Sequence, residues 1–200
     1  MRALYRKNGR VHGVGVNDAD YAVKPVGPDG QMEICPFYRT WQSMLTRAYS
    51  PVYHLLRPTY VGTTVCEEWH LFMAFRAWMA EQDWEGKQLD KDIRQPGNKQ
   101  YSPQTCMFVT PEINRLLNDH AAARGDFPIG VACRENRYQA RVRENGKEKH
   151  LGLFDTPEEA HLAWRKAKVA IIRRAAMTGD IYLYSGLMQH ANLIEQGQVA

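Results

Sequence analysis

The sequence lacks the features that mark several large classes of protein. None of its apolar runs approaches the roughly 18 residues that a membrane span needs. No apolar stretch follows the basic residues near the N-terminus, so we expect no secretory signal. The four cysteines form no CxxC pair, and this leaves a zinc site without support. These absences argue against a membrane protein and a disulfide-dense secreted domain, and they predict a cytoplasmic protein with reduced thiols.

Positive charge is in small excess over the whole chain but is unevenly distributed. The 200 residues include 26 Lys and Arg against 22 Asp and Glu, a net charge of +4. Between Arg134 and Arg174, eleven basic and six acidic residues give +5, so the rest of the chain is slightly negative. A local concentration of this kind is what binding to nucleic acid requires.

The order of hydrophobic patterns predicts an α+β chain in three parts. A Gly- and Pro-containing break over residues 121–128 separates an aromatic-rich part, 1–124, from a second domain, 125–178, and a tail, 179–200. In the first part, helical spacing predicts helices over 37–50 and 66–82. The aromatic stripe of the second helix has two interpretations, a stacking platform for bases or a packed core, and the helical spacing favours the core.

The second domain is predicted to be three antiparallel strands packed on one helix. Strands are expected over 129–133, 138–143 and 147–154, and Asn145-Gly146 supplies the signal for a two-residue hairpin turn. Thr156, Pro157 and Glu159 form the start signal of the helix that follows. Its apolar side would cover one face of the sheet and leave the other face bare.

Alternation along the middle strand places arginines on that bare face. Gln139, Arg141 and Arg143 point away from the side that Tyr138 and Val142 occupy. A small twisted sheet fits a DNA major groove, where arginine binds guanine. The alternative is a solvated face, because glutamates are interleaved at 135, 144 and 148. The predicted DNA-binding residues are Arg134, Arg137, Arg141, Arg143, Lys147, Lys149 and His150.

Residues 129–176 resemble the AP-two domain, the DNA-binding domain of ethylene-response factors that also occurs in phage homing endonucleases. The resemblance is carried by Gly130-Val131, by residues 138–142 and by the LGLFDTPEEA run that ends at Ala160. It implies that the sheet contacts duplex DNA through Arg134, Arg141, Arg143 and His150. Ala132 stands where the family has arginine and His150 where it has tryptophan, so the base preference of the plant proteins is not implied.

The central stretch, residues 89–114, predicts a strand, a polar loop, a strand and a helix. Strands are expected over 88–93 and 106–109, with the helix starting at Thr110-Pro111. This is the outline of the ββα-metal nuclease motif, in which a divalent ion stabilises charge on the scissile phosphate and a histidine activates water.

Two carboxylates in this stretch have the spacing of a metal pair. Asp90 and Asp92 would share one face of a strand and could bind Mg²⁺ or another divalent ion, whereas Lys91 would point the opposite way. The alternative is that these three residues form surface ion pairs on a degenerate scaffold. Asn98 and Asn114 are further catalytic candidates, with turn-forming and helix-surface roles as their alternatives.

The same stretch resembles phage-encoded HNH endonucleases, especially those joined to an AP-two domain. The resemblance rests on Asn98-Lys99 and the TCMFVT run that starts at Thr105. Upstream it extends to residues 13–18, Cys35-Pro36, Trp41 with Met44, and residues 65–69. The histidines that give the family its name are missing, since no histidine lies between His70 and His120. The sequence leaves open whether either of these approaches Asp90.

Two functions are therefore predicted. The first is a phage-type, metal-dependent endonuclease that acts on double-stranded DNA in the cytoplasm of a bacterial host. The second is a catalytically inactive DNA-binding regulator or phage effector that keeps the endonuclease scaffold and has a host protein as a possible further partner. A third, a protein-interaction module built on the aromatic-rich half, is less favoured because those aromatics are expected to be buried.

Overall fold

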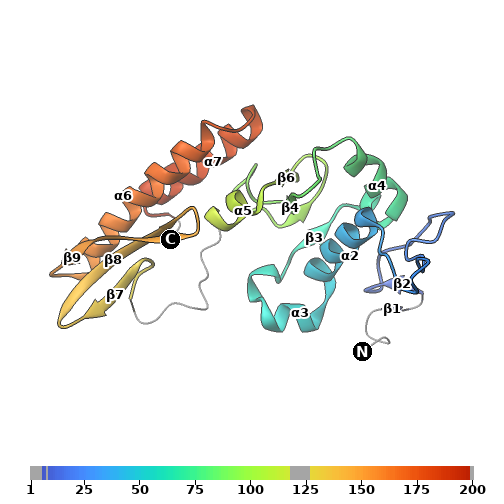
Figure 1. The fold of residues 1–200 in the computed structure, drawn as a ribbon, viewed down its shortest axis with the longest axis horizontal. Coiled ribbons are helices and arrows are strands. Elements are labelled where there is room, and N and C mark those ends of the chain that lie inside the picture. Colours follow the sequence, from blue (N-terminus) through green and yellow to red (C-terminus); the bar gives the residue numbers. More distant parts are fainter. Residues whose placement is uncertain (1–5, 8, 118–126, 199–200) are drawn as a thin grey trace. The chain divides into compact units, whose positions relative to one another are not determined.

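The chain folds into two units of mixed α and β structure. The computed structural model describes residues 6–7, 9–117 and 127–198. The two compact units are Met1–Val109 and Thr110–Ala200 (Figure 1). The division lies between Val109 and Thr110, whereas the sequence placed a boundary at 124/125. Helix α5 (Pro111–Leu117) accounts for the difference, because Ile113, Leu116 and Leu117 pack against the hydrophobic core of the second unit.

The described part of the first unit consists of short elements around three helices. Strands β1 (Arg6–Lys7) and β2 (Arg10–Val11) form a hairpin, followed by α2 (Pro36–Tyr49), α3 (Pro51–Leu56) and the 3-10 turn η1 (Pro58–Tyr60). Next come β3 (Thr64–Val65), the 3-10 turn η2 (Glu67–His70) and α4 (Phe72–Ala80), then β4 (Gln88–Asp90), β5 (Gln100–Tyr101) and β6 (Met107–Val109). Strand β3 pairs with β5 in parallel, and β4 pairs with β6 in antiparallel orientation.

Large aromatic side chains form the core of this unit, as the helical spacing predicted. Trp41, Trp69, Phe72 and Phe75 are fully buried. The indole Nε1 of Trp41 donates to the Trp69 carbonyl at 2.7 Å, which satisfies a polar group that burial would otherwise leave without a partner. A Cβ atom on Gly15 would lie within 3 Å of Trp41, so only glycine allows this close approach of the chain.

The expected continuous helix over 66–82 is wrong, because the chain is extended at Leu71. Val16 donates its backbone N–H to the His70 carbonyl at 2.8 Å, and Phe72 donates to the Val16 carbonyl at 3.0 Å. This bridge from a distant segment draws Leu71 out of helical geometry (φ −87°, ψ 129°). Side-chain periodicity carries no information about such a long-range backbone pairing.

The second unit contains the predicted three-stranded antiparallel sheet packed on a helix. Its strands β7 (Val131–Arg134), β8 (Arg137–Glu144) and β9 (Lys147–Phe154) lie in that order and are followed by α6 (Pro157–Ala176) (Figure 1). The turn at Asn145-Gly146 has positive φ at both residues, as a two-residue hairpin loop requires. The predicted capping box between Thr156 and Glu159 is also confirmed.

One face of this sheet is covered by α6. Trp164 and Ile172 from α6 and Val142 from β8 belong to a single buried cluster. The tail forms a further helix, α7 (Ile181–Glu195), which packs beside α6 through Leu187 and Ala191 (Figure 1).

Strand β9 contains a bulge opposite the middle of β8. Ala140 pairs with Gly152 but Arg141 pairs with His150, so Leu151 is an extra residue. Leu151 packs toward the core of the unit, and beyond it the alternation of β9 is reversed.

None of the helices in the described part of the chain is long and apolar enough to cross a lipid bilayer.

Gly130 provides a test of this packing. Its φ is +79°, and a Cβ at this position would lie 2.0 Å from Trp164 Cδ1. We expect Gly130→Ala to destabilise the second unit by about 2–4 kcal/mol, since left-handed strain adds to overpacking. Hydrogen exchange of the full chain, read by mass spectrometry, measures the loss over residues 131–195.

The matched control is Gly146→Ala. Its φ is +76°, but nothing lies within 4 Å of the added Cβ, so only the backbone strain of about 1–2 kcal/mol is expected. Equal losses in the two variants would show that the contact with Trp164 does not constrain the fold.

Candidate nucleic-acid interface

Helix α6 covers one face of the three-stranded sheet, and we call the opposite face the outer face. The outer face carries the arginines predicted to bind DNA. On β8 the alternating residues Arg137, Gln139, Arg141 and Arg143 share this face, since Ala140 and Val142 are buried on the other. Register places Arg134 of β7 opposite Arg137. These arginines therefore occupy one surface, as alternation predicted.

Two of the outer-face arginines have acidic partners. Arg141 Nη1 lies 2.9 Å from Glu148 Oε1, and Arg137 Nη2 lies 3.1 Å from Asp155 Oδ1. Arg134 and Arg143 are exposed and form no ion pair with the residues that the structure describes. The surface therefore combines neutralised arginines, whose geometry is fixed, with cations that are available to an external anion.

Alternation along β9 separates its candidate residues. His150 pairs with Arg141 and Glu148 pairs with Arg143, so both lie on the outer face. Lys149 pairs with Val142 and Lys147 with Glu144, which places these lysines on the side that α6 covers. Both lysines are exposed at the hairpin end of the sheet.

A depression of about 210 Å³ lies in the outer face. Its lining includes Gln139 and Leu153, which the sequence did not select as functional residues. Gln139 donates from Nε2 to Nδ1 of His150 at 2.9 Å. The signal that could have identified Gln139 was its alternation with Arg141, whereas Leu153 depends on the register of β9.

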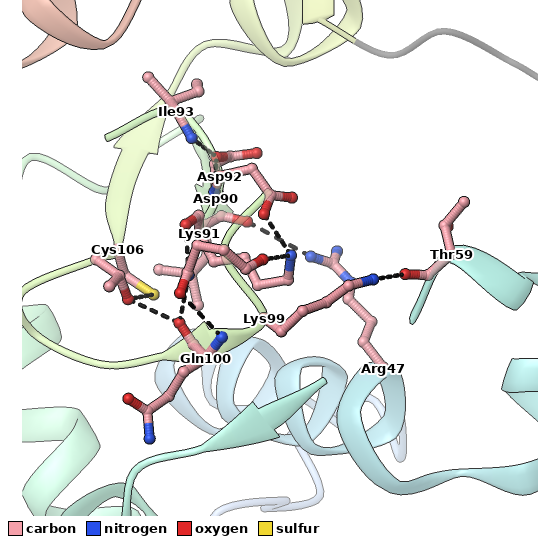
Figure 2. Close-up of polar contacts among 12 residues, drawn as sticks. Arg47, Thr59, Asp90, Lys91, Asp92, Ile93, Lys99, Gln100 and Cys106 are labelled. Carbon is pink, nitrogen blue, oxygen red and sulfur yellow. Dashed lines mark hydrogen bonds and ion pairs between the residues drawn. The ribbon is translucent and has the colours of Figure 1, made fainter. Parts of the chain in front are cut away.

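The central candidates, Asp90 and Asp92, do not share the face of a strand. The predicted strand over 88–93 is too long, because β4 ends at Asp90. Asp90 Oδ1 accepts hydrogen bonds from the backbone N–H of Asp92 at 2.7 Å and of Ile93 at 2.8 Å, and this turns the chain (Figure 2). The side chain of Asp90 therefore ends β4 by accepting hydrogen bonds from the backbone that follows it.

Lys91, expected to point away from the two carboxylates, is buried and contacts Asp92. Its Nζ donates to Asp92 Oδ1 at 2.5 Å and to the Asn98 carbonyl at 2.8 Å (Figure 2). Asn98 Nδ2 donates to the carbonyls of Lys91 and Gln100, and its Oδ1 accepts from Gln100 N–H. Asn98 therefore binds the two ends of the loop together.

This arrangement does not fit a divalent metal site. One oxygen of Asp90 is already used by two backbone N–H groups, and the ammonium of Lys91 lies against Asp92, where it would repel a cation. Among the described residues, no group of three or more His, Cys, Asp or Glu side chains is placed to hold a metal ion. Burial raises the pKa of the Asp90 carboxyl, and the nearby charge of Asp92 acts in the same direction.

The remaining candidates lie elsewhere. His70 Nε2 lies 3.3 Å from the hydroxyl of Tyr49, which also contacts Val65. His120 lies outside the described residues. Asn114 is on α5 of the second unit. The structure thus groups Asp90, Lys91, Asp92 and Asn98, but supplies them with no contact to a histidine in the described part of the chain.

The cysteines are free thiols. Burial raises the pKa of Cys106 to about 12, so this thiol stays protonated at neutral pH and is a poor metal ligand.

Comparisons with protein-family models, with curated proteins and with solved structures found no match to this chain.

The buried carboxyl of Asp90 makes stability depend on pH. Because its pKa is higher in the folded state, Asp90 contributes stability that is present at low pH and lost as the pH rises through the folded pKa. Asp90→Asn keeps the oxygen that accepts from Asp92 and Ile93. We expect this variant to be at least as stable as the wild type at neutral pH, with the difference closing as the pH falls.

Urea unfolding followed by tryptophan fluorescence, between about pH 4 and pH 7, measures this difference. Asp20→Asn is the control, since it makes the same chemical change at an exposed side chain. A large loss of stability in Asp90→Asn at neutral pH would show that the carboxylate charge itself stabilises the loop.

Proposed function

We propose that this protein binds duplex DNA through the outer face of its three-stranded sheet. The observation that carries the proposal is the placement of Arg134, Arg141 and Arg143 on one exposed surface while α6 occupies the opposite one. A sheet of this size fits a major groove, and arginine side chains bind both guanine edges and phosphates. The resemblance of residues 129–176 to the AP-two domain implies the same face.

The ion pairs of this surface suggest that different arginines contact phosphates and bases. Arg143 and Arg134 are available for phosphates, and the exposed Lys147 and Lys149 add positive charge at the hairpin end of the sheet. Arg141 is held by Glu148, so it is better suited to a fixed contact with a base than to a mobile contact with the backbone. Sequence-independent attraction and base recognition would therefore come from different side chains.

For the first unit, we propose a scaffold of the HNH type that does not cleave DNA. The antiparallel strands β4 and β6 with the loop between them, followed along the chain by α5, keep the strand–loop–strand–helix order of that motif. The contacts of Asp90, Lys91 and Asp92 support an inactive version, since Asp90 Oδ1, Lys91 Nζ and Asp92 Oδ1 are bonded within the loop. A DNA-binding regulator or effector, acting in the cytoplasm of a bacterial host, is the function most consistent with both units.

Loss of Arg143 should weaken binding to any duplex. Arg143→Ala removes one phosphate contact, so we expect the slope of log K against log salt concentration to flatten by about 0.9. Fluorescence anisotropy with a labelled duplex over a salt series gives both the affinity and the slope.

The matched control is Lys166→Ala on the exposed side of α6, which removes the same charge away from the outer face. It should leave the slope unchanged. Equal effects of the two substitutions would show that net charge, rather than the sheet, determines binding.

We expect no nicking of supercoiled plasmid in the presence of Mg²⁺ or Mn²⁺. Asp90 Oδ1 accepts from two backbone N–H groups, and the ammonium of Lys91 lies against Asp92, where it would repel a divalent ion. Agarose-gel nicking assays compare the wild type with Asp92→Ala. Metal-dependent nicking that disappears in Asp92→Ala would overturn the inactive assignment and restore the endonuclease.

A further inference from the structure

The depression in the outer face differs chemically from the surface around it. Its floor includes the neutral side chains of Gln139 and Leu153, which face each other across β8 and β9 in direct register. His150 and the arginines at 134 and 137 complete the lining with Glu135. Neutral groups contribute little to attraction for phosphate, so their place in the middle of a cationic surface requires another explanation.

Only one of the two polar atoms of the Gln139 carboxamide has a hydrogen-bond partner among the described residues. Its Nε2 donates to Nδ1 of His150 at 2.9 Å, while its Oε1 is buried and has no hydrogen-bond partner among the described residues. If the carboxamide were flipped, its oxygen would bind His150 and its nitrogen would have no partner. One buried polar atom of Gln139 would therefore lack a hydrogen bond in either orientation. A buried amide atom without a partner is unfavourable in the free protein, and a ligand that supplies the partner recovers that loss.

A carboxamide has one natural complement in the major groove. Adenine presents the N7 acceptor beside the N6 donor, and glutamine binds both through its nitrogen and oxygen. Gln139 keeps a second N–H for N7 after donating one to His150. The side chain of Leu153, 45% exposed in the same depression, offers the apolar contact that a thymine methyl group favours.

We propose that Gln139 reads the adenine of an A·T base pair, with Leu153 against the thymine methyl group and His150 as the positioning residue that holds the carboxamide. This rests on the proposed function, since it assigns a base to the same surface. Binding of the base would give the carboxamide oxygen the hydrogen-bond partner that it lacks in the free protein.

The experiment uses the full chain and a library of random duplexes. Selection with the wild type yields a preferred site, and anisotropy then gives the affinity for each single-base-pair change in it. We expect one position at which replacing A·T by G·C weakens binding by about 5- to 100-fold, and at which Gln139→Ala reduces this ratio to within about twofold. Arg143→Ala should lower the affinity for all duplexes and keep the ratio.

Three further measurements separate base reading from a general effect on folding. Gln139→Glu keeps an acceptor but loses the donor, so the preference at that position should move from adenine to cytosine. His150→Gln keeps an acceptor for the amide and should retain the ratio, whereas His150→Leu should lose it. Replacing the thymine by deoxyuridine removes only the methyl group and should weaken the wild type more than Leu153→Ala.

The outcomes distinguish the two proposals. If the wild type fails to bind any duplex at low salt, DNA binding itself is wrong. If it binds a preferred site but Gln139→Ala keeps every base preference of the wild type, the reading role of Gln139 is wrong while DNA binding stands.

Discussion

The packing of Trp164 on the sheet is the constraint on which the C-terminal unit depends. The indole lies so close to Gly130 that no Cβ fits between them, and with Ile172 it buries the inner face of β8. Successive side chains of a strand point to opposite faces, so burial of Ala140 and Val142 places the alternating arginines of β8 on the outer face. The proposed DNA-binding surface is therefore a consequence of core packing, and not of charge alone.

Most of this unit could be predicted from the sequence because its signals are local. The Asn145-Gly146 turn, the capping box of Thr156 and the alternation of β8 each involve residues within a few positions of one another. The bulge at Leu151 has no such signal, since it is a property of how two strands pair. Charge alone grouped Lys147 and Lys149 with the arginines, although the register set by the Asn145-Gly146 turn places these lysines on the other side.

The first unit was harder to predict because its critical contacts are distant or polar. A bridge from Val16 divides the expected helix at Leu71, and the carboxylate of Asp90 ends β4 by binding the backbone two and three residues ahead. Of two carboxylates spaced for a metal pair, that of Asp90 thus forms a turn and that of Asp92 binds Lys91. Spacing alone does not distinguish these roles from metal binding, because it contains no information about the contacts of Lys91 and Asn98.

The bulge in β9 also determines the chemical character of the outer face. Regular pairing from the Asn145-Gly146 turn would place Leu151 opposite Ala140 and Gly152 opposite Gln139. The extra residue moves Gly152 to Ala140 and brings Leu153 opposite Gln139 instead. One inserted residue thus gives the outer face an apolar side chain where it would otherwise have a glycine.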